Sequence, residues 1–269
     1  MQMQKQLRRR GRPKGSGAQQ PSGIQALDRA LDVLEALAAH DGMTLTQLAD
    51  HLDQSAATMH RVLATLEGRR YVEIDPKRQE WLIGPEAFRL GSSFMRSSGI
   101  FERSRPIMRD LMLQTGETSN LGIEQDEEII FISQVETHET IRAFFPPGTK
   151  SPLHASGIGK AMLSSFDDQR IEQFIRKAEF KNYTEKTICS AEQLRDAIAE
   201  SRRLGYSLDD EERTTGMRCV AACILNVYGE AIAGISVSGP TSRMQSSKVH
   251  EIGQLVSSAA RELSKRLGA

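Results

Sequence analysis

The chain has 269 residues, 39% of them hydrophobic and 26% charged, which suits two domains of ordinary size and excludes a fully disordered or fibrous protein. No run of about 18 apolar residues occurs and the basic amino terminus lacks an apolar signal core, so we expect a cytoplasmic protein without a membrane span. Three cysteines, Cys189, Cys219 and Cys223, are too few for a disulfide framework and have no zinc spacing, so we expect reduced thiols and no metal.

The net charge is zero, but the basic charge is concentrated in residues 1–23. Six cations and no acid stand there, so the rest of the chain carries a net charge of about −6. The segment has almost nothing to bury, and we expect it to be disordered when free. Residues 8–14, Arg-Arg-Arg-Gly-Arg-Pro-Lys, are similar to the minor-groove hooks of architectural proteins. An equally good interpretation is a polycationic arm that contacts phosphates without base preference.

Residues 24–85 predict a winged helix-turn-helix. Apolar residues recur at helical spacing from Ile24 to Ala38, and Thr44 with Gln47 forms a capping box for a second helix that ends near Leu52. A polar turn leads to a third helix that runs to about Arg69. Two alternating stretches, 71–74 and 80–83, joined by the turn 75–78, predict a hairpin. This order of elements is that of a winged helix-turn-helix, a DNA-binding fold.

The outward face of the third helix is suited to DNA. If Met59, Leu63 and their apolar neighbours face the core, small residues, hydroxyls and Arg61 point outward. Small side chains allow close approach to base edges, and arginine can make bidentate contacts with guanine or phosphate. An ordinary solvated helix is the alternative. The candidate DNA-binding residues are Arg8, Arg9, Arg10, Arg12, Thr44, Ser55, Ala57, Thr58, His60, Arg61 and Thr65.

The second half predicts an α+β effector-sized domain over residues 116–269, after two linker helices in 86–115 with interruptions near 97–99 and Pro106. We expect strands at 119–124, 129–136, 140–145, 206–211, 217–225 and 231–238. We expect helices from Ser156 and over 168–178, 191–204 and 247–267. The sheet should be mainly antiparallel, because several strands follow one another through short turns.

A glycine-rich segment, residues 153–161, predicts a small-molecule site. It passes from a strand end through Gly157 and Gly159 into a helix, where free amides favour anions and glycines allow close approach. Plain packing would also explain the glycines. The Walker pattern is absent, so nucleotide hydrolysis has no support.

Two later strands add polar groups to this site. Alternation places Ser236 and Ser238 on one face of their strand, and Cys219 lies on the neighbouring strand after an acidic run that begins at Asp209. Taken singly, Cys219 and Cys223 can equally be inert buried residues. As a set with the glycine-rich amides, these groups can enclose a small carboxylate.

Four stretches together resemble the IclR family of bacterial transcription regulators over nearly the whole chain: 27–34, 58–63, 153–161 and 235–240. Residues 8–13, 204–206, 209–212 and 216–219 resemble most the family's glyoxylate-responsive regulators of allantoin and glyoxylate metabolism. The resemblance implies a GAF-like effector domain, dimers through the DNA-binding half and often tetramers through the effector half. It also implies that the effector contacts Ser156, Gly157, Ile158, Gly159, Asp209, Met217, Cys219, Ser236 and Ser238.

The sequence therefore predicts a transcription regulator that binds double-stranded operator DNA, needs no cofactor and responds to glyoxylate. Pyruvate or another short oxo-acid is the alternative effector. A second class of function is an enzyme with Cys219 or Ser236 as nucleophile, for which His154 is the only histidine close in sequence to a pocket element. A third is an architectural DNA-binding protein, which would leave the effector domain unexplained.

Overall fold

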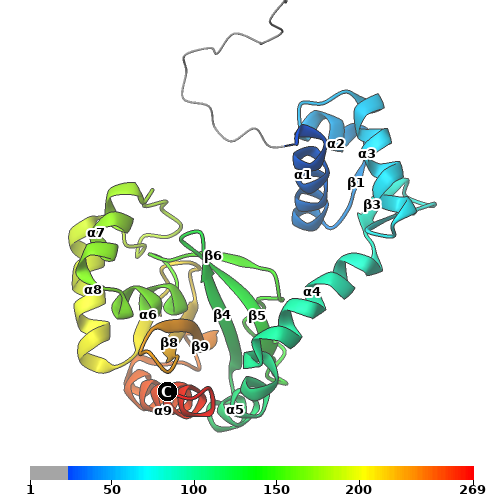
Figure 1. Cartoon of the computed structure of the whole chain (residues 1–269). Helices are drawn as coiled ribbons and strands as arrows, with labels where there is room; N and C mark the ends of the chain where they lie inside the picture. The colour runs from blue at the N-terminus through cyan, green and yellow to red at the C-terminus, as the bar shows by residue number, and fades with distance from the viewer. Residues whose placement is uncertain (1–23) are drawn as a thin grey trace, which may run out of the picture. The chain divides into compact units, whose positions relative to one another are not determined.

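The computed structural model describes residues 24–269, which form two compact units divided after Ser92 (Figure 1). The predicted basic arm, residues 1–23, lies outside the described residues. Within the described range, no helix is both long and apolar enough to cross a membrane.

The first unit is the predicted winged helix-turn-helix. Its elements are α1 (Gln25–His40), β1 (Met43–Thr44), α2 (Leu45–His51), α3 (Ala56–Gly68), β2 (Val72–Asp75) and β3 (Glu80–Ile83). The strands form an antiparallel sheet in the order β1-β3-β2. The three helices and Trp81 of β3 enclose one core, whose fully buried members include Val33, Leu48, Met59 and Leu63.

The apolar residues of α1 do not all face this core. Val33, Ala36 and Leu37 are buried, whereas Ile24, Leu27 and Leu31 are 70%, 55% and 49% exposed. The exposed set repeats every three to four residues, so it lies along one side of the helix. We call Ile24, Leu27 and Leu31 the α1 stripe; it is an apolar surface that the first unit leaves uncovered.

The chain leaves the first unit through α4 (Pro85–Ser98) and enters α5 (Ile100–Thr115). Gly99 separates the two helices with a φ of 60°, a left-handed conformation that glycine adopts without strain. The interruption that we predicted at Pro106 is wrong, because α5 continues through it. Burial of Ile107, Met108 and Leu111 stabilises the helix there. α5 therefore belongs to the core of the second unit and is not a linker.

The second unit is built on a six-stranded antiparallel sheet, which confirms the predicted α+β class. Its strands are β4 (Thr118–Gln125), β5 (Glu128–Val135), β6 (Lys150–Pro152), β7 (Ser207–Asp210), β8 (Met217–Leu225) and β9 (Ala231–Pro240). The spatial order is β6-β5-β4-β9-β8-β7. The helices are α6 (Gly157–Ser165), α7 (Asp168–Lys177), α8 (Ala191–Leu204), a 3-10 turn (Ser246–Lys248) and α9 (Val249–Arg266).

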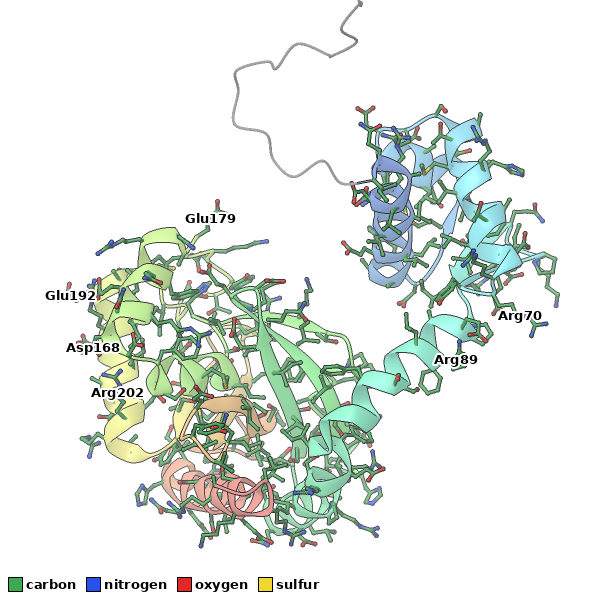
Figure 2. The ribbon with its side chains drawn as sticks, viewed as in Figure 1. Arg70, Arg89, Asp168, Glu179, Glu192 and Arg202 are labelled. Atoms are coloured by element: carbon green, nitrogen blue, oxygen red, sulfur yellow. The ribbon has the colours of Figure 1, made fainter. Side chains whose placement is uncertain are left out.

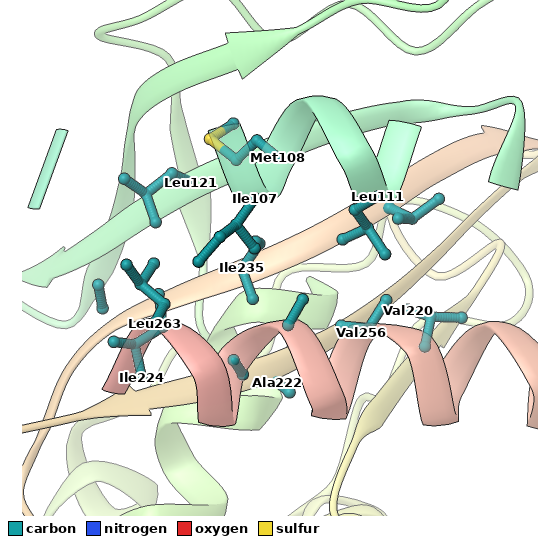
Figure 3. Close-up of a cluster of buried hydrophobic side chains, with 14 of the residues drawn as sticks. Ile107, Met108, Leu111, Leu121, Val220, Ala222, Ile224, Ile235, Val256 and Leu263 are labelled. Atoms are coloured by element: carbon teal, nitrogen blue, oxygen red, sulfur yellow. The ribbon is translucent and has the colours of Figure 1, made fainter. Parts of the chain in front are cut away.

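Helices cover both faces of this sheet (Figure 1). On one face, α5 and α9 pack against alternate strand residues such as Leu121, Val220 and Ile235 (Figure 3). On the other face, α6, α7 and α8 pack against residues such as Phe131 and Ala221. The outer sides of α7 and α8 carry charged groups, and Arg202 contacts Asp168 at 3.1 Å (Figure 2). Both faces of the sheet are thus anchored by apolar packing, and the polar residues that concern the site below lie on the α6 side.

One predicted strand, 140–145, is wrong. The segment is irregular, and the edge position beside β5 is taken by β6, which pairs Ser151 with Ile129. Side-chain contacts hold the irregular segment: Arg142 Nε donates to Glu136 at 2.6 Å, and Arg243 donates to the Ile141 carbonyl at 2.8 Å. These contacts, and not a strand ladder, hold the segment in place.

Candidate functional sites

The first candidate site is the outward face of α3. Ser55 caps the helix, its Oγ accepting a hydrogen bond from the Thr58 N–H at 3.2 Å. From this start, helical geometry buries Met59, Leu63 and Leu66 and directs other side chains outward. Among the predicted DNA-binding residues, Ala57, His60, Arg61 and Thr65 are exposed and Thr58 is half-buried. Their contact with DNA stays a prediction.

The predicted hydroxyls of this unit already have local partners. Thr44 caps α2 with the predicted capping box: its Oγ1 accepts from the Gln47 N–H at 3.3 Å, and Gln47 Oε1 accepts from the Thr44 N–H at 2.8 Å. Thr65 Oγ1 donates to the Arg61 carbonyl at 2.9 Å. The first role of these hydroxyls is to stabilise α2 and α3. A contact with a DNA phosphate would come in addition to these hydrogen bonds.

The structure adds basic residues that the sequence argument did not include. Arg29 of α1 and Arg61 of α3 line one groove between the two helices. Lys77 and Arg78 are exposed on the turn between β2 and β3, where a winged fold can reach the DNA backbone. Lys77 and Arg78 could have been identified as candidate DNA contacts from the predicted turn. Arg29 could not, because it lines the same groove as Arg61 only through the packing of α1 against α3.

The second candidate site is a narrow cavity of about 30 Å³ between α6 and the ends of β7 and β8. The residues that line it are Phe131, Phe145, Ser151, Ser156, Gly157, Asp209, Arg213, Thr214, Met217, Arg218, Cys219 and Ser238. Ser156, Gly157, Asp209, Met217, Cys219 and Ser238 were predicted; the others were not.

The polar wall of the cavity is a row across three strands. Asp209 of β7 lies opposite Cys219 of β8, and Cys219 lies opposite Ser238 of β9. The first turn of α6 is packed against this row: a side-chain carbon at Gly157 would lie only 2.7 Å from Cys219 Sγ. Only glycine allows this approach, which brings the N–H groups at the helix start close to the polar row.

Three predicted effector contacts do not line the cavity. Gly159 is required by packing, since a side-chain carbon there would lie 2.4 Å from the Leu153 carbonyl oxygen. Its N–H donates to Ser156 Oγ at 3.0 Å as part of the helix cap, so it is not free for a ligand. The Ile158 side chain packs over Gly234 of β9. Ser236 is fully buried and accepts a weak contact from Asn120 Nδ2 at 3.5 Å.

Asn120 was missed by the sequence argument and organises the two serines. Its Nδ2 also donates to Ser238 Oγ at 3.2 Å, and its Oδ1 accepts from Gln134 Nε2 at 2.9 Å. Because Asn120 is a donor to Ser238, the serine hydroxyl hydrogen is left to donate elsewhere. The signal was present in the sequence: the alternation of β4 places Asn120 on the same face as Gly122.

A buried charge cluster lies behind the polar row. Lys160 of α6 is 2% exposed, and its Nζ donates to Glu212 Oε1 and to the Leu208 carbonyl. Asp209 accepts from the Glu212 N–H at 2.7 Å. Burial raises the pKa of Glu212 to about 7 and also raises the pKa of Asp209. Glu212 Oε2 has no partner among the described residues, so one lysine neutralises two buried acids incompletely.

The geometry gives no support to a nucleophilic cysteine or serine. Burial raises the pKa of Cys219 to about 11 and that of Cys223 to about 12, which keeps both thiols protonated at neutral pH. His154, the candidate base, is not among the cavity-lining residues, and its Nε2 contacts the Lys181 carbonyl at 3.1 Å. Burial lowers the pKa of His154.

These thiol environments predict unequal reactivity. With iodoacetamide at pH 7.5, Cys189, which is exposed, should be alkylated, while Cys219 and Cys223 should react at least tenfold more slowly because they are half-buried and their raised pKa keeps them protonated. Peptide mass spectrometry over time measures the three rates. Unfolding in urea should equalise them, which serves as the control. Equal rates in the folded protein would contradict the described environment of Cys219.

A winged helix-turn-helix followed by an α+β domain, whose cavity combines an apolar lining with one polar row, defines a DNA-binding transcription regulator with a ligand-binding domain. Two family models match the chain: the IclR helix-turn-helix domain over residues 26–76, and the bacterial transcriptional regulator IclR C-terminal domain over residues 92–265. The chain belongs to the IclR family.

Known regulators are similar to this chain over nearly its full length. The chain is 51% identical over 266 residues to the HTH-type transcriptional regulator BhcR of Paracoccus denitrificans, covering 97% of this chain and 95% of that protein. It is 38% identical over 264 residues to the transcriptional repressor IclR of Escherichia coli, covering 97% and 96%. The crystal structure of an IclR homologue from Microbacterium hydrocarbonoxydans in complex with 4-hydroxybenzoate is similar with a TM-score of 0.79 at 21% identity, covering 90% and 98%.

Proposed function

We propose that the cavity of the second unit binds a short 2-oxo acid, glyoxylate in the first place, and that the bound acid changes the affinity of the first unit for operator DNA. The observation that carries this proposal is the row Asp209, Cys219 and Ser238 facing the first turn of α6 at Gly157. Pyruvate or another short oxo-acid is the alternative ligand, since Met217 and Phe131 leave an apolar side to the cavity.

In this proposal the ligand carboxylate accepts from the N–H group of Gly157, which lines the cavity, and from the backbone N–H of the next residue, Ile158, whose side chain is packed away on Gly234. Amides in the first turn of a helix have no intrahelical partner and attract anions. The remaining ligand oxygens then face Ser238, Cys219 and Asp209, which supply donors and an acceptor on neighbouring strands. The related structure from Microbacterium hydrocarbonoxydans, which holds 4-hydroxybenzoate, supports a carboxylate as the class of ligand.

We further propose that the protein works as a dimer or tetramer in the cytoplasm, where operator DNA is found. The α1 stripe and the exposed Phe88 and Leu90 of α4 are apolar surfaces that pairing of two DNA-binding units would cover. Paired units read two half-sites, so a small change in their spacing changes operator affinity. A coupling of about 1–3 kcal/mol between effector and operator is enough to change occupancy.

The double variant Ser236→Ala plus Ser238→Ala tests the proposed cavity. The unmodified protein should bind glyoxylate, pyruvate or glycolate in calorimetric titration and change its operator affinity when the acid is added. The double variant should bind the acid at least tenfold more weakly, because Ser238 faces the ligand and Ser236 helps to hold Asn120. In gel shifts without the acid, its operator binding should be unchanged.

Ser164→Ala plus Ser165→Ala is the matched control, since these two hydroxyls donate to carbonyls within α6 at 2.7 and 2.6 Å. This control should keep the full response to the acid. An unaltered glyoxylate titration in the first double variant, with both proteins folded, would count against the proposed cavity.

A further inference from the structure

One arginine beside the cavity has no acidic partner although it follows four acids in a row. Residues 209–212 are Asp-Asp-Glu-Glu, and three cations pair with the last three of these acids. Lys160 contacts Glu212, Lys186 contacts Asp210 and Glu211, and Arg218 contacts Asp210. Arg213 comes next in the chain, and among the side chains that the structure describes no carboxylate forms an ion pair with it.

Arg213 is nevertheless held in a defined position. Its guanidinium carbon lies 3.9 Å from the centre of the Tyr183 ring, over the face of that ring. The side chain is half-buried and lines the cavity together with Thr214 and Phe145. Stacking occupies one face of the guanidinium and leaves its N–H groups, which lie in the plane, able to donate. Arg213 thus presents oriented donors without an acceptor.

The rest of the cavity disfavours an acid ligand. Asp209 lines the wall, Glu212 lies behind it, and Lys160 already contacts Glu212. A carboxylate that enters the cavity meets this acidic pair, and repulsion is strong where water is excluded. The amides of α6 offset part of it, but they carry only partial charges. Arg218, the other arginine that lines the cavity, already pairs with Asp210. The positive charge that balances a bound acid therefore has to come from Arg213.

We propose that Arg213 determines the charge specificity of the cavity: its guanidinium pairs with the bound acid and makes the site select ionised carboxylates over neutral molecules of the same size. This inference rests on the proposed function and adds a residue and a selection rule to it. The residue lies outside the contact set that the sequence predicted.

The test compares two ligands that differ in the carboxylate: glyoxylate, and glycolaldehyde, which is also a two-carbon aldehyde but is neutral. Calorimetric titration should show that Arg213→Gln weakens glyoxylate binding by about 10- to 30-fold, the range of a lost charge-assisted hydrogen bond. Its affinity for glycolaldehyde should stay within threefold of the unmodified protein. Arg213→Lys should recover part of the loss, because it restores the charge without the planar donors.

Arg203→Gln is the control, since Arg203 pairs with Glu200 on the exposed side of α8. It should leave both titrations unchanged, and thermal melting should show that each variant is folded. The salt dependence of the unmodified protein is an independent measure: glyoxylate binding should weaken with added NaCl, and glycolaldehyde binding should not.

Two outcomes overturn the inference alone: an unchanged glyoxylate affinity in Arg213→Gln, or an equal loss for both ligands. If the unmodified protein binds no short oxo-acid at all, the proposed function and the inference fall together.

Discussion

Lys160→Met is expected to destabilise the second unit by about 3–5 kcal/mol at pH 7.5, the cost of removing one partner of a buried ion pair. Lys160 is 2% exposed and donates to both Glu212 and the Leu208 carbonyl. Methionine fills a similar volume, so the loss should come from charge and not from a cavity. Urea unfolding followed by circular dichroism measures the free energy of unfolding.

The pH dependence of this variant identifies the cause. Burial raises the pKa of Glu212 from 4.5 to about 7 even with Lys160 present, and loss of the lysine should raise it further. The folded state then keeps a proton that the unfolded state releases above pH 4.5. The stability of the variant is therefore highest at low pH and is lost as the pH rises from 4.5 through the folded-state pKa, which lies above 7 in the variant. The variant should recover most of its stability between pH 8 and pH 5.

The double variant Lys160→Met plus Glu212→Gln should recover more than half of the loss at pH 7.5, since it removes the uncompensated charge. Lys186→Met is the matched control: its pair with Glu211 is half exposed, so its removal should cost about 1 kcal/mol or less. A loss for Lys160→Met that does not change with pH and is not rescued by Glu212→Gln would show that packing, not charge, is responsible.

Much of the fold could be predicted because periodicity and capping act locally. The bounds expected for α8 and β8 agree with the structure, since Gly205 ends the first and a continuous alternating run defines the second. The short strands β1 and β6 were missed because two or three residues carry no period. The error at Pro106 has the opposite origin: local chemistry disfavours proline within a helix, and packing of α5 against α9 overrides it.

The candidate site could be predicted in part from the same local patterns. Strand alternation and the order of β8 and β9 were enough to bring Cys219 and Ser238 together. Gly159 was predicted as a contact but does not line the cavity, because a glycine that permits packing against Leu153 has the same sequence signature as one that admits a ligand. Phe145 and Arg213 could not be found, because an irregular segment and a turn bring them to the cavity only in the folded protein.

Deletion of residues 1–14 should produce the largest change in operator binding. This stretch holds six cations, Lys5, Arg8, Arg9, Arg10, Arg12 and Lys14, and lies outside the described residues, so the prediction depends on charge alone. Each cation that meets a phosphate contributes roughly 0.9 to the slope of log affinity against log salt concentration. In gel shifts over a salt series, the truncated protein should bind operator DNA more weakly. The slope of log affinity against log salt concentration should be smaller in magnitude by up to about 5.

The turn between β2 and β3 supplies the matched control. Lys77→Gln plus Arg78→Gln removes two exposed cations from the first unit and should flatten the slope by at most roughly 1.8. Full affinity and an unchanged slope after the deletion would mean that the arm does not touch DNA.

Operators with A·T-rich or G·C-rich flanks then separate the two interpretations of the arm. A minor-groove hook reads the width of the groove, so its deletion should cost more affinity on the A·T-rich flank. A polycationic arm neutralises phosphates, whose spacing does not depend on the bases, so its deletion should cost the same on both flanks. The comparison isolates shape from charge, because the truncation removes the same six cations in each case.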